Sequence, residues 1–187
     1  MSNEKPRSEL QILPATSEML SDIHLLEEAC FSSPWTRKML EAELIGNQFA
    51  HFLVAMHQGQ SPLRAKSSIV GYHCFWIVFE ELRLMNLAVR DSIRRQGIGK
   101  ALVREAIRVA LDQAATRAVL EVRASNEPAR SLYTMMGFVH VGTRPQYYTN
   151  PIEDAVLMEM NPLVIPSGRL RVPTCRIGGD STSTDSL

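Results

Sequence analysis

The sequence lacks the features that mark several large classes of protein. Its three cysteines stand far apart and form no CxxC pair, so their spacing indicates neither a disulfide framework nor a zinc ribbon. None of its five histidines has another histidine four residues away, so the helical metal-ligand pattern is absent as well. We therefore expect no metal, and a fold that depends on its apolar core.

The chain also lacks an excess of charge and a long apolar run. Lys plus Arg and Asp plus Glu number 20 each, whereas a dedicated nucleic-acid binder usually carries a basic excess. The longest apolar run, Cys74 to Phe79, is far shorter than the roughly 20 residues of a membrane-spanning helix. The first residues contain no apolar signal segment. These absences predict a cytoplasmic protein without a nucleic-acid or membrane partner.

The chain is long enough for one domain with a core of its own. It has 187 residues, of which 45% are hydrophobic. Short apolar segments predict strands at residues 10–14, 52–56, 69–79, 82–89, 118–122, 138–142 and 155–160, and residues 69–79 are rich in Val, Ile, Phe and Trp. Apolar residues recur at helical spacing in residues 20–30, 39–44, 98–111 and 128–136. The mixture predicts an α/β (α+β) fold around one mostly antiparallel sheet.

A basic loop that contains glycine lies between a predicted strand and the clearest predicted helix. It reads Arg94-Arg95-Gln96-Gly97-Ile98-Gly99-Lys100. A helix N-terminus offers unpaired N–H groups and the positive end of the helix dipole, and glycine lets the backbone approach an anion closely. The loop lacks the spacing of a Walker loop, and Leu102 stands where a dinucleotide fingerprint needs its third glycine. It predicts a phosphate or pyrophosphate cradle, with a plain turn and solvated arginines as the alternative.

A second group of candidate residues begins in the fifth predicted strand. Alternation places Glu121 and Arg123 on the face opposite the apolar residues of that strand. The pattern alone favours a solvent-facing carboxylate for Glu121, paired with Arg123. Asn126 is a candidate cap of the following helix, and Tyr133 is a candidate core aromatic on that helix.

The end of the chain divides into an aromatic segment and a polar tail. Tyr147 and Tyr148 stand between Pro145 and Pro151, which predicts a loop. The two tyrosines are candidates for a substrate groove, with a structural aromatic corner as the alternative. Residues 162–187 lose the strand and helix patterns and predict a mobile polar tail.

Taken together, these segments resemble the GCN5-related N-acetyltransferase (GNAT) superfamily. The matching segments are Asn86-Leu-Ala-Val89, Arg94-x-x-Gly97-x-Gly99, Asn126, and Ser131-Leu-Tyr133-x-x-x-Gly137-Phe138. The resemblance implies a GNAT domain over residues 9–161, with residues 162–187 as the tail. It also implies the GNAT fold, in which a mostly antiparallel mixed sheet of about seven strands is flanked by four helices.

Within the superfamily, the sequence looks most like bacterial ribosomal-protein-alanine N-acetyltransferases of the RimI type. The features that carry this likeness are Phe31-x-x-Pro34-Trp35, Leu120-Glu-Val-Arg-Ala-Ser-Asn126, Tyr147-Tyr148 and Glu153-Asp154-Ala155. The resemblance implies an enzyme that transfers acetyl from acetyl-CoA to the N-terminal alanine of a small-subunit ribosomal protein. The sequence departs from the subfamily in a longer segment between the second and third strands and in its tail.

The resemblance further implies a role for each matching residue. Backbone N–H groups of Leu87-Ala88-Val89 would hold the acetyl carbonyl and the pantetheine arm, which Asn126 also contacts. Glu121 would be the general base and Tyr133 the general acid. The pyrophosphate would lie on a cradle formed by Arg95, Gln96, Gly97, Ile98, Gly99 and Lys100, with Arg94 opening the motif.

The implied reaction is direct attack of an amine on a thioester, which explains the need for an acid and a base. An α-amino group has a pKa of about 7.7–8.0, so roughly a tenth is neutral at pH 7, whereas a lysine amine with a pKa of about 10.4 is almost wholly charged. A carboxylate can accept the amine proton, and a tyrosine can protonate the leaving thiolate. Two alternatives stay open: the same chemistry on a lysine, another protein N-terminus or a small amine, and a non-catalytic acyl-CoA-binding module.

Overall fold

A single sheet organises the part of the chain that the computed structural model describes, residues 10–57, 69–166 and 176–177. Its strands are β1 (Leu10–Pro14), β2 (Ala50–His57), β3 (Ile69–Val78), β4 (Glu81–Val89), β5 (Arg117–Arg123), β6 (Val139–Thr149), β7 (Ile152–Met160) and the two-residue β8 (Arg176–Ile177). They lie in the order β6-β7-β5-β4-β3-β2-β1-β8. Among these strands, β4 pairs with β5 and β1 pairs with β8 in parallel, and the other neighbours are antiparallel. The predicted mostly antiparallel mixed sheet is confirmed.

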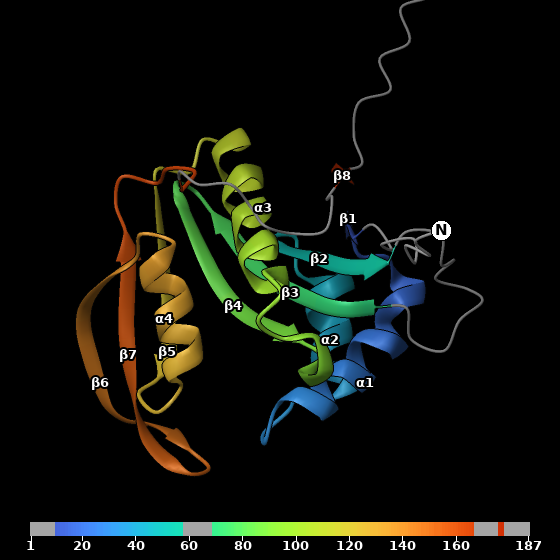
Figure 1. Ribbon diagram of the computed structural model, residues 1–187, viewed down its shortest axis with the longest axis horizontal. Coiled ribbons are helices and arrows are strands. Elements are labelled where there is room, and N and C mark those ends of the chain that lie inside the picture. The colour runs from blue at the N-terminus through green and yellow to red at the C-terminus, as the bar shows by residue number, and fades with distance from the viewer. Residues whose placement is uncertain (1–9, 58–68, 167–175, 178–187) are drawn as a thin grey trace, which may run out of the picture.

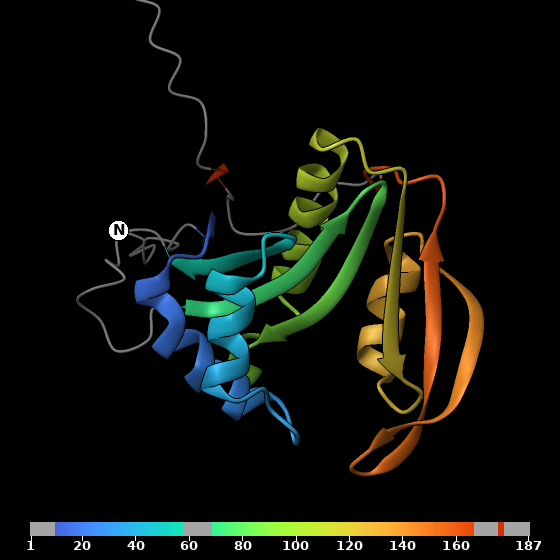
Figure 2. The ribbon, with the colours of Figure 1, turned by 180° about the vertical axis from the view of Figure 1, so that it is seen from behind.

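Four α-helices within the described residues cover the two faces of this sheet. They are α1 (Leu20–Cys30), α2 (Arg37–Glu41), α3 (Ile98–Asp112) and α4 (Glu127–Met135). Figure 1 and Figure 2 show α3 and α4 on one face and α1 and α2 on the other. The predicted four flanking helices are therefore confirmed. In the described ranges, no helix has the length and apolar character needed to cross a membrane.

The apolar spacing of the helices explains why each face is covered. The stripe on α3 that the sequence predicts is buried, and it packs with one side of the sheet in a cluster that also holds Tyr133 and Phe138 from the α4 region. On the other side, Leu20, Ile23 and Leu26 of α1 pack with Tyr72 and other residues of β2 to β4. The sheet is thus the middle layer of two cores.

The predicted loop at Tyr147 and Tyr148 is wrong, because both residues lie in β6. The strand continues past the expected end at residue 142 and reaches Thr149. Its register with β7 shifts between Arg144 and Tyr148, so Pro145 lies in an irregular stretch of an edge strand. A proline can occupy such a position because no ladder hydrogen bond needs its missing N–H.

The predicted tail falls mostly outside the described residues. Within residues 162–166, Leu163 is buried at 5% exposure and its N–H donates to Thr116 O (2.6 Å). Residues 176–177 form β8 beside β1. Mobility of residues 162–187 stays a prediction.

Candidate active site

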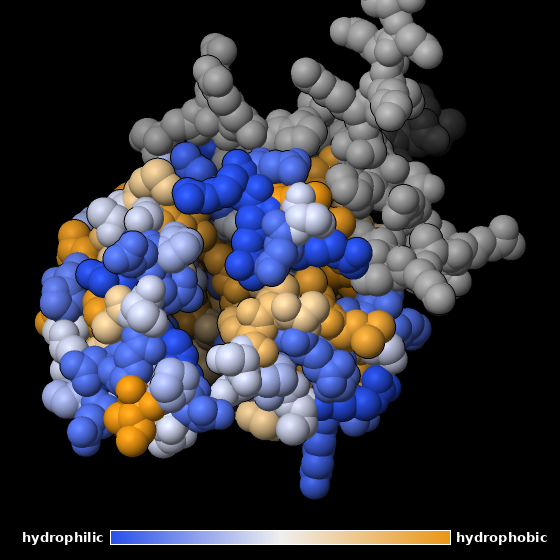
Figure 3. Space-filling model, turned by 60° about the horizontal axis from the view of Figure 1, so that its bottom comes forward, coloured by the Kyte–Doolittle hydropathy of each residue, from blue (hydrophilic) through white to orange (hydrophobic). Residues whose placement is uncertain are grey.

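The two parallel strands at the centre of the sheet separate before they end. Their ladder stops at the pair Leu84 and Leu120, although both strands continue beyond it. The register between β3 and β4 shifts at Met85, and such a bulge bends a strand. The strands diverge toward their carboxyl ends (Figure 2). On that side, the surface is hollowed between the two halves of the molecule (Figure 3).

The end of β4 presents backbone groups to this opening. The N–H of Arg90 donates to the carbonyl of Val70 on β3 (2.9 Å), so it points away from β5. Because backbone groups of successive strand residues point in opposite directions, the N–H groups of Leu87 and Val89 face the opening. The predicted acetyl-holding segment, Leu87-Ala88-Val89, therefore has a strand edge that β5 leaves free.

The predicted phosphate cradle is the start of α3. Gly97 precedes the helix with a φ of 85°, a left-handed conformation that glycine adopts without steric cost. The first helical hydrogen bond runs from Ala101 N to Gly97 O (3.0 Å). The N–H groups of residues 98–100 consequently have no partner within the helix. Together with the positive end of the helix dipole, they fit a phosphate or pyrophosphate.

The arginines before α3 differ in what they contact. Arg94 donates from Nε to Val89 O (3.0 Å) and forms an ion pair with Asp91 (2.6 Å). This side chain therefore braces the loop against the end of β4. Arg95 and Gln96 are exposed beside the start of α3, where Arg95 adds positive charge.

Asn126 caps α4, the helix that follows β5. Its Oδ1 accepts a hydrogen bond from Ala129 N (3.2 Å), which confirms the predicted cap. This bond uses the oxygen of the side-chain amide and not its nitrogen. Since α3 follows β4 and α4 follows β5, both helices begin near the carboxyl ends of the diverging strands (Figure 1).

Glu121 is a half-buried carboxylate between two buried residues of β5, which confirms the predicted alternation. The predicted pairing with Arg123 is wrong. Glu121 Oε1 lies 2.5 Å from Nη1 of Arg144 on β6. Arg123 stands at the end of β5, where it pairs with the carboxylate of Glu153 on β7 (3.2 Å) and donates to two backbone carbonyls of the turn between β6 and β7.

Tyr133 is buried on the inner face of α4, as the core-aromatic alternative predicts. It is 7% exposed, and its ring meets Phe138 edge-on with 5.7 Å between the centroids. Burial and the nearby Tyr148 raise the pKa of Tyr133, so its hydroxyl carries a proton at neutral pH. Glu121 lies on the face of β5 away from α4, so the two candidates flank the sheet from opposite sides.

Tyr147 and Tyr148 form a small aromatic cluster near Glu121. Their rings meet edge-on at 5.2 Å, and the guanidinium of Arg123 lies 4.1 Å from the centre of the Tyr148 ring. A hydrogen bond to Glu121 raises the pKa of Tyr147. Arg144 lies 5.5 Å from the Tyr147 ring. Both Tyr147 and Arg144 therefore hold the carboxylate of Glu121 in place.

Two residues of this region were not found from the sequence. Arg144 is an exposed strand residue, and no spacing indicates its partner. Glu27 on α1 has an exposed fraction of zero. The sequence could have indicated that Glu27 is buried. It lies seven residues after Leu20 and four after Ile23, within the apolar stripe of the helix.

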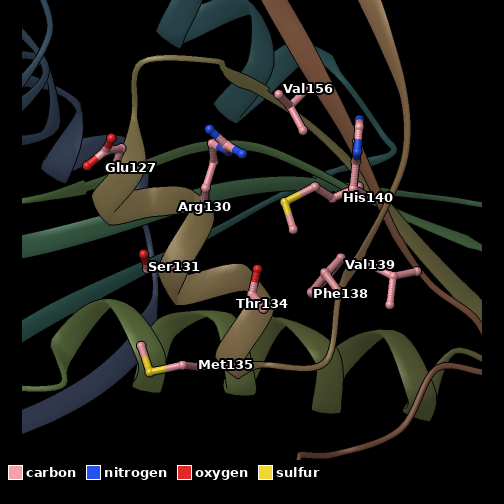
Figure 4. A pocket seen from close by; sticks show the side chains of 10 residues that line it. Glu127, Arg130, Ser131, Thr134, Met135, Phe138, Val139, His140 and Val156 are labelled. Carbon is pink, nitrogen blue, oxygen red and sulfur yellow. The ribbon is translucent and has the colours of Figure 1, made fainter.

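A separate hollow of about 780 Å³ lies between α4 and the strands β6 and β7. Glu127, Arg130 and Thr134 line it from α4, and His140 from β6 stands opposite them (Figure 4). It includes none of the predicted site residues. Arg130 donates to Ala124 O (2.9 Å), so its guanidinium already has a partner.

The described ranges also contain no group of three or more residues that could hold a metal ion.

Comparison with known proteins relates these features to one family. The sequence model described as the acetyltransferase (GNAT) family matches residues 20–138. The chain belongs to the GNAT family. This GNAT protein is therefore an acyltransferase, and the resemblance inferred from its motifs is confirmed.

Named relatives refine the comparison. The putative ribosomal protein bS18-alanine N-acetyltransferase of Bacillus subtilis is 36% identical over 141 residues, which is 75% of this chain and 88% of that protein. The bS18-alanine N-acetyltransferase of Escherichia coli K12 is 29% identical over 147 residues, or 78% and 92% of the two chains. The likeness of this GNAT sequence to the RimI type is thereby confirmed.

Solved structures agree on the fold. The crystal structure of the Escherichia coli S18-alanine N-acetyltransferase matches with a TM-score of 0.72 at 25% identity, covering 83% of this chain and 95% of that one. Arabidopsis thaliana NAA60 in complex with acetyl-CoA matches with a TM-score of 0.73 at 18% identity, covering 81% and 98%. The predicted GNAT fold is confirmed.

Proposed function

We propose that this enzyme transfers acetyl from acetyl-CoA to the N-terminal alanine of a small-subunit ribosomal protein. The observation that carries the proposal is the pair of bacterial relatives named for this activity, which align over 88% and 92% of their own length. The opening between β4 and β5, with α3 starting beside it, supports the same reaction class.

The residues around the opening fit acetyl-CoA. The start of α3 offers N–H groups and the positive charge of Arg95 to the pyrophosphate. The pantetheine arm contains amide groups, which can form hydrogen bonds with the edge of a strand as a neighbouring strand does. The edge of β4 at Leu87-Ala88-Val89 offers backbone groups for such bonds. The nitrogen of the Asn126 side-chain amide adds a donor near the start of α4. Acetyl-CoA supplies the thioester carbonyl that the acceptor amine attacks.

The chain itself supplies the proton transfers in this proposal. Glu121 accepts a proton from the acceptor ammonium, directly or through a water molecule. Arg144 and Tyr147 fix the orientation of the Glu121 carboxylate during this proton transfer. The N–H of Val89 donates toward the carbonyl oxygen, where negative charge develops. Tyr133 donates its phenolic proton to the departing sulfur.

An α-amino acceptor suits this site better than a lysine. The carboxylate must remove a proton from an amine of pKa about 7.7–8.0 in the first case and about 10.4 in the second. The aromatic pair Tyr147 and Tyr148 lies beside Glu121, where it can flank a peptide N-terminus. The proposed acceptor is therefore a free N-terminus.

The test is release of CoA thiol from acetyl-CoA with a panel of three peptides. The first has a free N-terminal alanine and no lysine, the second is the same peptide with a blocked N-terminus, and the third has a blocked N-terminus and one lysine. We expect turnover of the first peptide alone. Turnover of the lysine peptide would overturn the acceptor assignment, and acetyl-CoA binding without turnover of any peptide would favour a small amine or a binding module.

A further inference from the structure

A buried carboxylate holds three elements together on the face of the sheet opposite α3. Glu27 on α1 has an exposed fraction of zero. Its Oε1 accepts hydrogen bonds from the backbone N–H of Trp35 (2.9 Å) and from Nδ2 of Asn86 on β4 (3.0 Å). Its Oε2 accepts a short hydrogen bond from the hydroxyl of Tyr72 on β3. Both oxygens are therefore used by donors from outside α1.

The donors connect α1 to the opening described above. Asn86 immediately precedes Leu87-Ala88-Val89, the free edge of β4. Trp35 belongs to the segment between α1 and α2, residues 31–36, which we call the α1–α2 turn. Through one carboxylate oxygen, Glu27 thus fixes the α1–α2 turn at a set distance from the end of β4.

The α1–α2 turn lies across from the aromatic pair. Ser33 Oγ is 3.4 Å from the carbonyl of Asn150, which belongs to the turn between β6 and β7 and follows Tyr148 by two residues. The same turn holds Arg123 through that carbonyl (2.9 Å). The α1–α2 turn and the end of β6 therefore approach each other as two sides of one site near Glu121.

Apart from the contact of Ser33 with Asn150, two further hydrogen bonds of the α1–α2 turn within the described residues run between neighbours in sequence. The N–H of Phe31 donates to Glu27 O (3.1 Å), which ends α1, and Thr36 caps α2 through Met39 N (3.3 Å). Both bonds are local. The bond from Trp35 N to Glu27 is the one among these that aligns the turn with the buried network beneath β4.

We propose that Glu27 is a positioning residue that fixes the α1–α2 turn as one wall of the acceptor site, opposite Tyr147 and Tyr148. The inference rests on the proposed function, because the wall matters only if an amine enters beside Glu121. Glu27 acts here through the geometry of its oxygens and touches no reacting atom.

The chemistry of the network separates this role from that of a second base. Desolvation raises the pKa of Glu27, and its three hydrogen bonds oppose that rise. A glutamine can keep most of the network, since its oxygen accepts from Trp35 and Asn86 and its NH₂ donates to the hydroxyl oxygen of Tyr72, which reverses the direction of that one bond. A leucine cannot, and it leaves buried donors without partners. A positioning role therefore tolerates Glu27→Gln and not Glu27→Leu.

The experiment compares Glu27→Leu, Glu27→Gln and a control, Glu105→Leu, on the full chain. Glu105 is also a buried glutamate, but it lies on α3 and pairs with Arg108 (2.7 Å). With the best acceptor peptide of the panel, we expect Glu27→Leu to raise the acceptor KM about tenfold or more, the effect of losing a charged hydrogen bond. We expect Glu27→Gln and Glu105→Leu to change it less than about threefold. The KM for acetyl-CoA should change little in all three and reports that each variant is folded.

A second measurement does not depend on the acceptor. Hydrogen exchange followed by mass spectrometry should show faster exchange of residues 31–36 in Glu27→Leu and unchanged exchange in Glu27→Gln and Glu105→Leu. Equal exchange in all variants would overturn the inference. So would a Glu27→Gln variant that loses kcat with an unchanged acceptor KM, because the charge rather than the geometry would then matter. If no peptide is acetylated by the unaltered protein, the proposed function fails, while the exchange data still report on Glu27.

Discussion

Two glutamates illustrate how the same side chain is used differently in this fold. Glu121 lies half-buried on β5, where Arg144 and Tyr147 hold it at the edge of the proposed acceptor site. Glu27 is fully buried and accepts three hydrogen bonds from neighbouring elements. A carboxylate that must exchange a proton needs access to its substrate, whereas one that positions a turn needs a rigid and dry environment.

Removing either proposed proton-transfer group should slow the reaction. We expect Glu121→Gln and Tyr133→Phe each to lower kcat by about 10²-fold or more, the usual range for general acid or base catalysis. The KM for acetyl-CoA should stay close to that of the unaltered enzyme. Steady-state kinetics with the free-alanine peptide tests this, and Glu159→Gln, a partly buried carboxylate on β7, is the control. Full turnover in both variants would exclude the assigned roles.

A buried histidine should make the protein sensitive to acid. Burial lowers the pKa of His73 on β3 from 6.5 to about 4. As the pH falls through 6.5, the unfolded chain binds a proton that the folded state resists until about pH 4. The free energy of unfolding should therefore fall over this window, by up to about 3 kcal/mol.

The measurement is urea unfolding of the unaltered chain and of His73→Leu at pH about 7 and about 4. The variant lacks the titrating ring, so its stability should decline less between the two conditions. An equal decline in both proteins would contradict the assignment to His73.

At the scale of elements, the proposed site depends on a parallel pair of strands at the centre of a mostly antiparallel sheet. Parallel strands bring their carboxyl ends to the same edge, so α3 and α4, which follow β4 and β5, both begin there. The ladder between β4 and β5 stops at Leu84 and Leu120, so the end of β4 has no ladder pairing with β5 beside two helix N-termini. The parallel pairing of β4 and β5 thus places the opening beside the helix start that is proposed to bind the pyrophosphate.

Asn126 should show two separable functions at the start of α4. Asn126→Ala removes the cap and should lower the free energy of unfolding by about 1 kcal/mol. Asn126→Asp keeps an oxygen for the N–H of Ala129 and should retain the stability. Both variants lack the amide nitrogen, so both should raise the KM for acetyl-CoA several-fold.

Thermal unfolding of the two variants measures the contribution of the cap to stability. Steady-state kinetics with varied acetyl-CoA measures the contribution of the amide nitrogen to the KM. If Asn126→Asp keeps the unaltered KM, the amide nitrogen does not contact the pantetheine arm. The cap would then be the whole role of this residue.

At the scale of the whole molecule, the sheet lies between two apolar cores, one on each face. The proposed active site lies at the centre of this sheet. The larger cluster spans α3, α4 and one side of the sheet, and it extends to Leu163 beyond β7. The smaller cluster joins α1 and α2 to the other side. Elements from both clusters meet at the ends of β4 and β5, so the site depends on the relative placement of the two layers.

The importance of Leu163 can be tested by shortening the chain. A protein that ends at residue 166 keeps Leu163 in the core and its N–H on Thr116 O. One that ends at residue 161 loses both, and burial of a leucine contributes about 1.5–3 kcal/mol. We expect the protein that ends at residue 166 to unfold at about the same urea concentration as the full chain. The protein that ends at residue 161 should be clearly less stable in urea. Equal stability of the two would show that the domain ends before Leu163.

Some properties were determined by the sequence alone, because they depend on local pattern. The period-2 alternation around Glu121 was sufficient to place its side chain on the open face of β5. The helical stripe from Ile98 to Leu111 predicted α3 and placed its N-terminus at the glycine-containing loop. The ordered set of motifs identified the family, since short segments at matching spacing are far more specific together than separately.

Other properties were decided only by tertiary structure, because they depend on residues far apart in the chain. Glu121 pairs with Arg144, 23 residues away, and not with its neighbour Arg123, because β7 pairs with β5 and β6 pairs with β7 in the same sheet. Tyr147 and Tyr148 lie in a strand because pairing with β7 overrides the turn tendency of Pro145. Glu27 is tolerated in the core because Trp35, Tyr72 and Asn86 converge on it from three other segments. Local preferences are small energies, and such long-range contacts outweigh them wherever the fold brings the partners together.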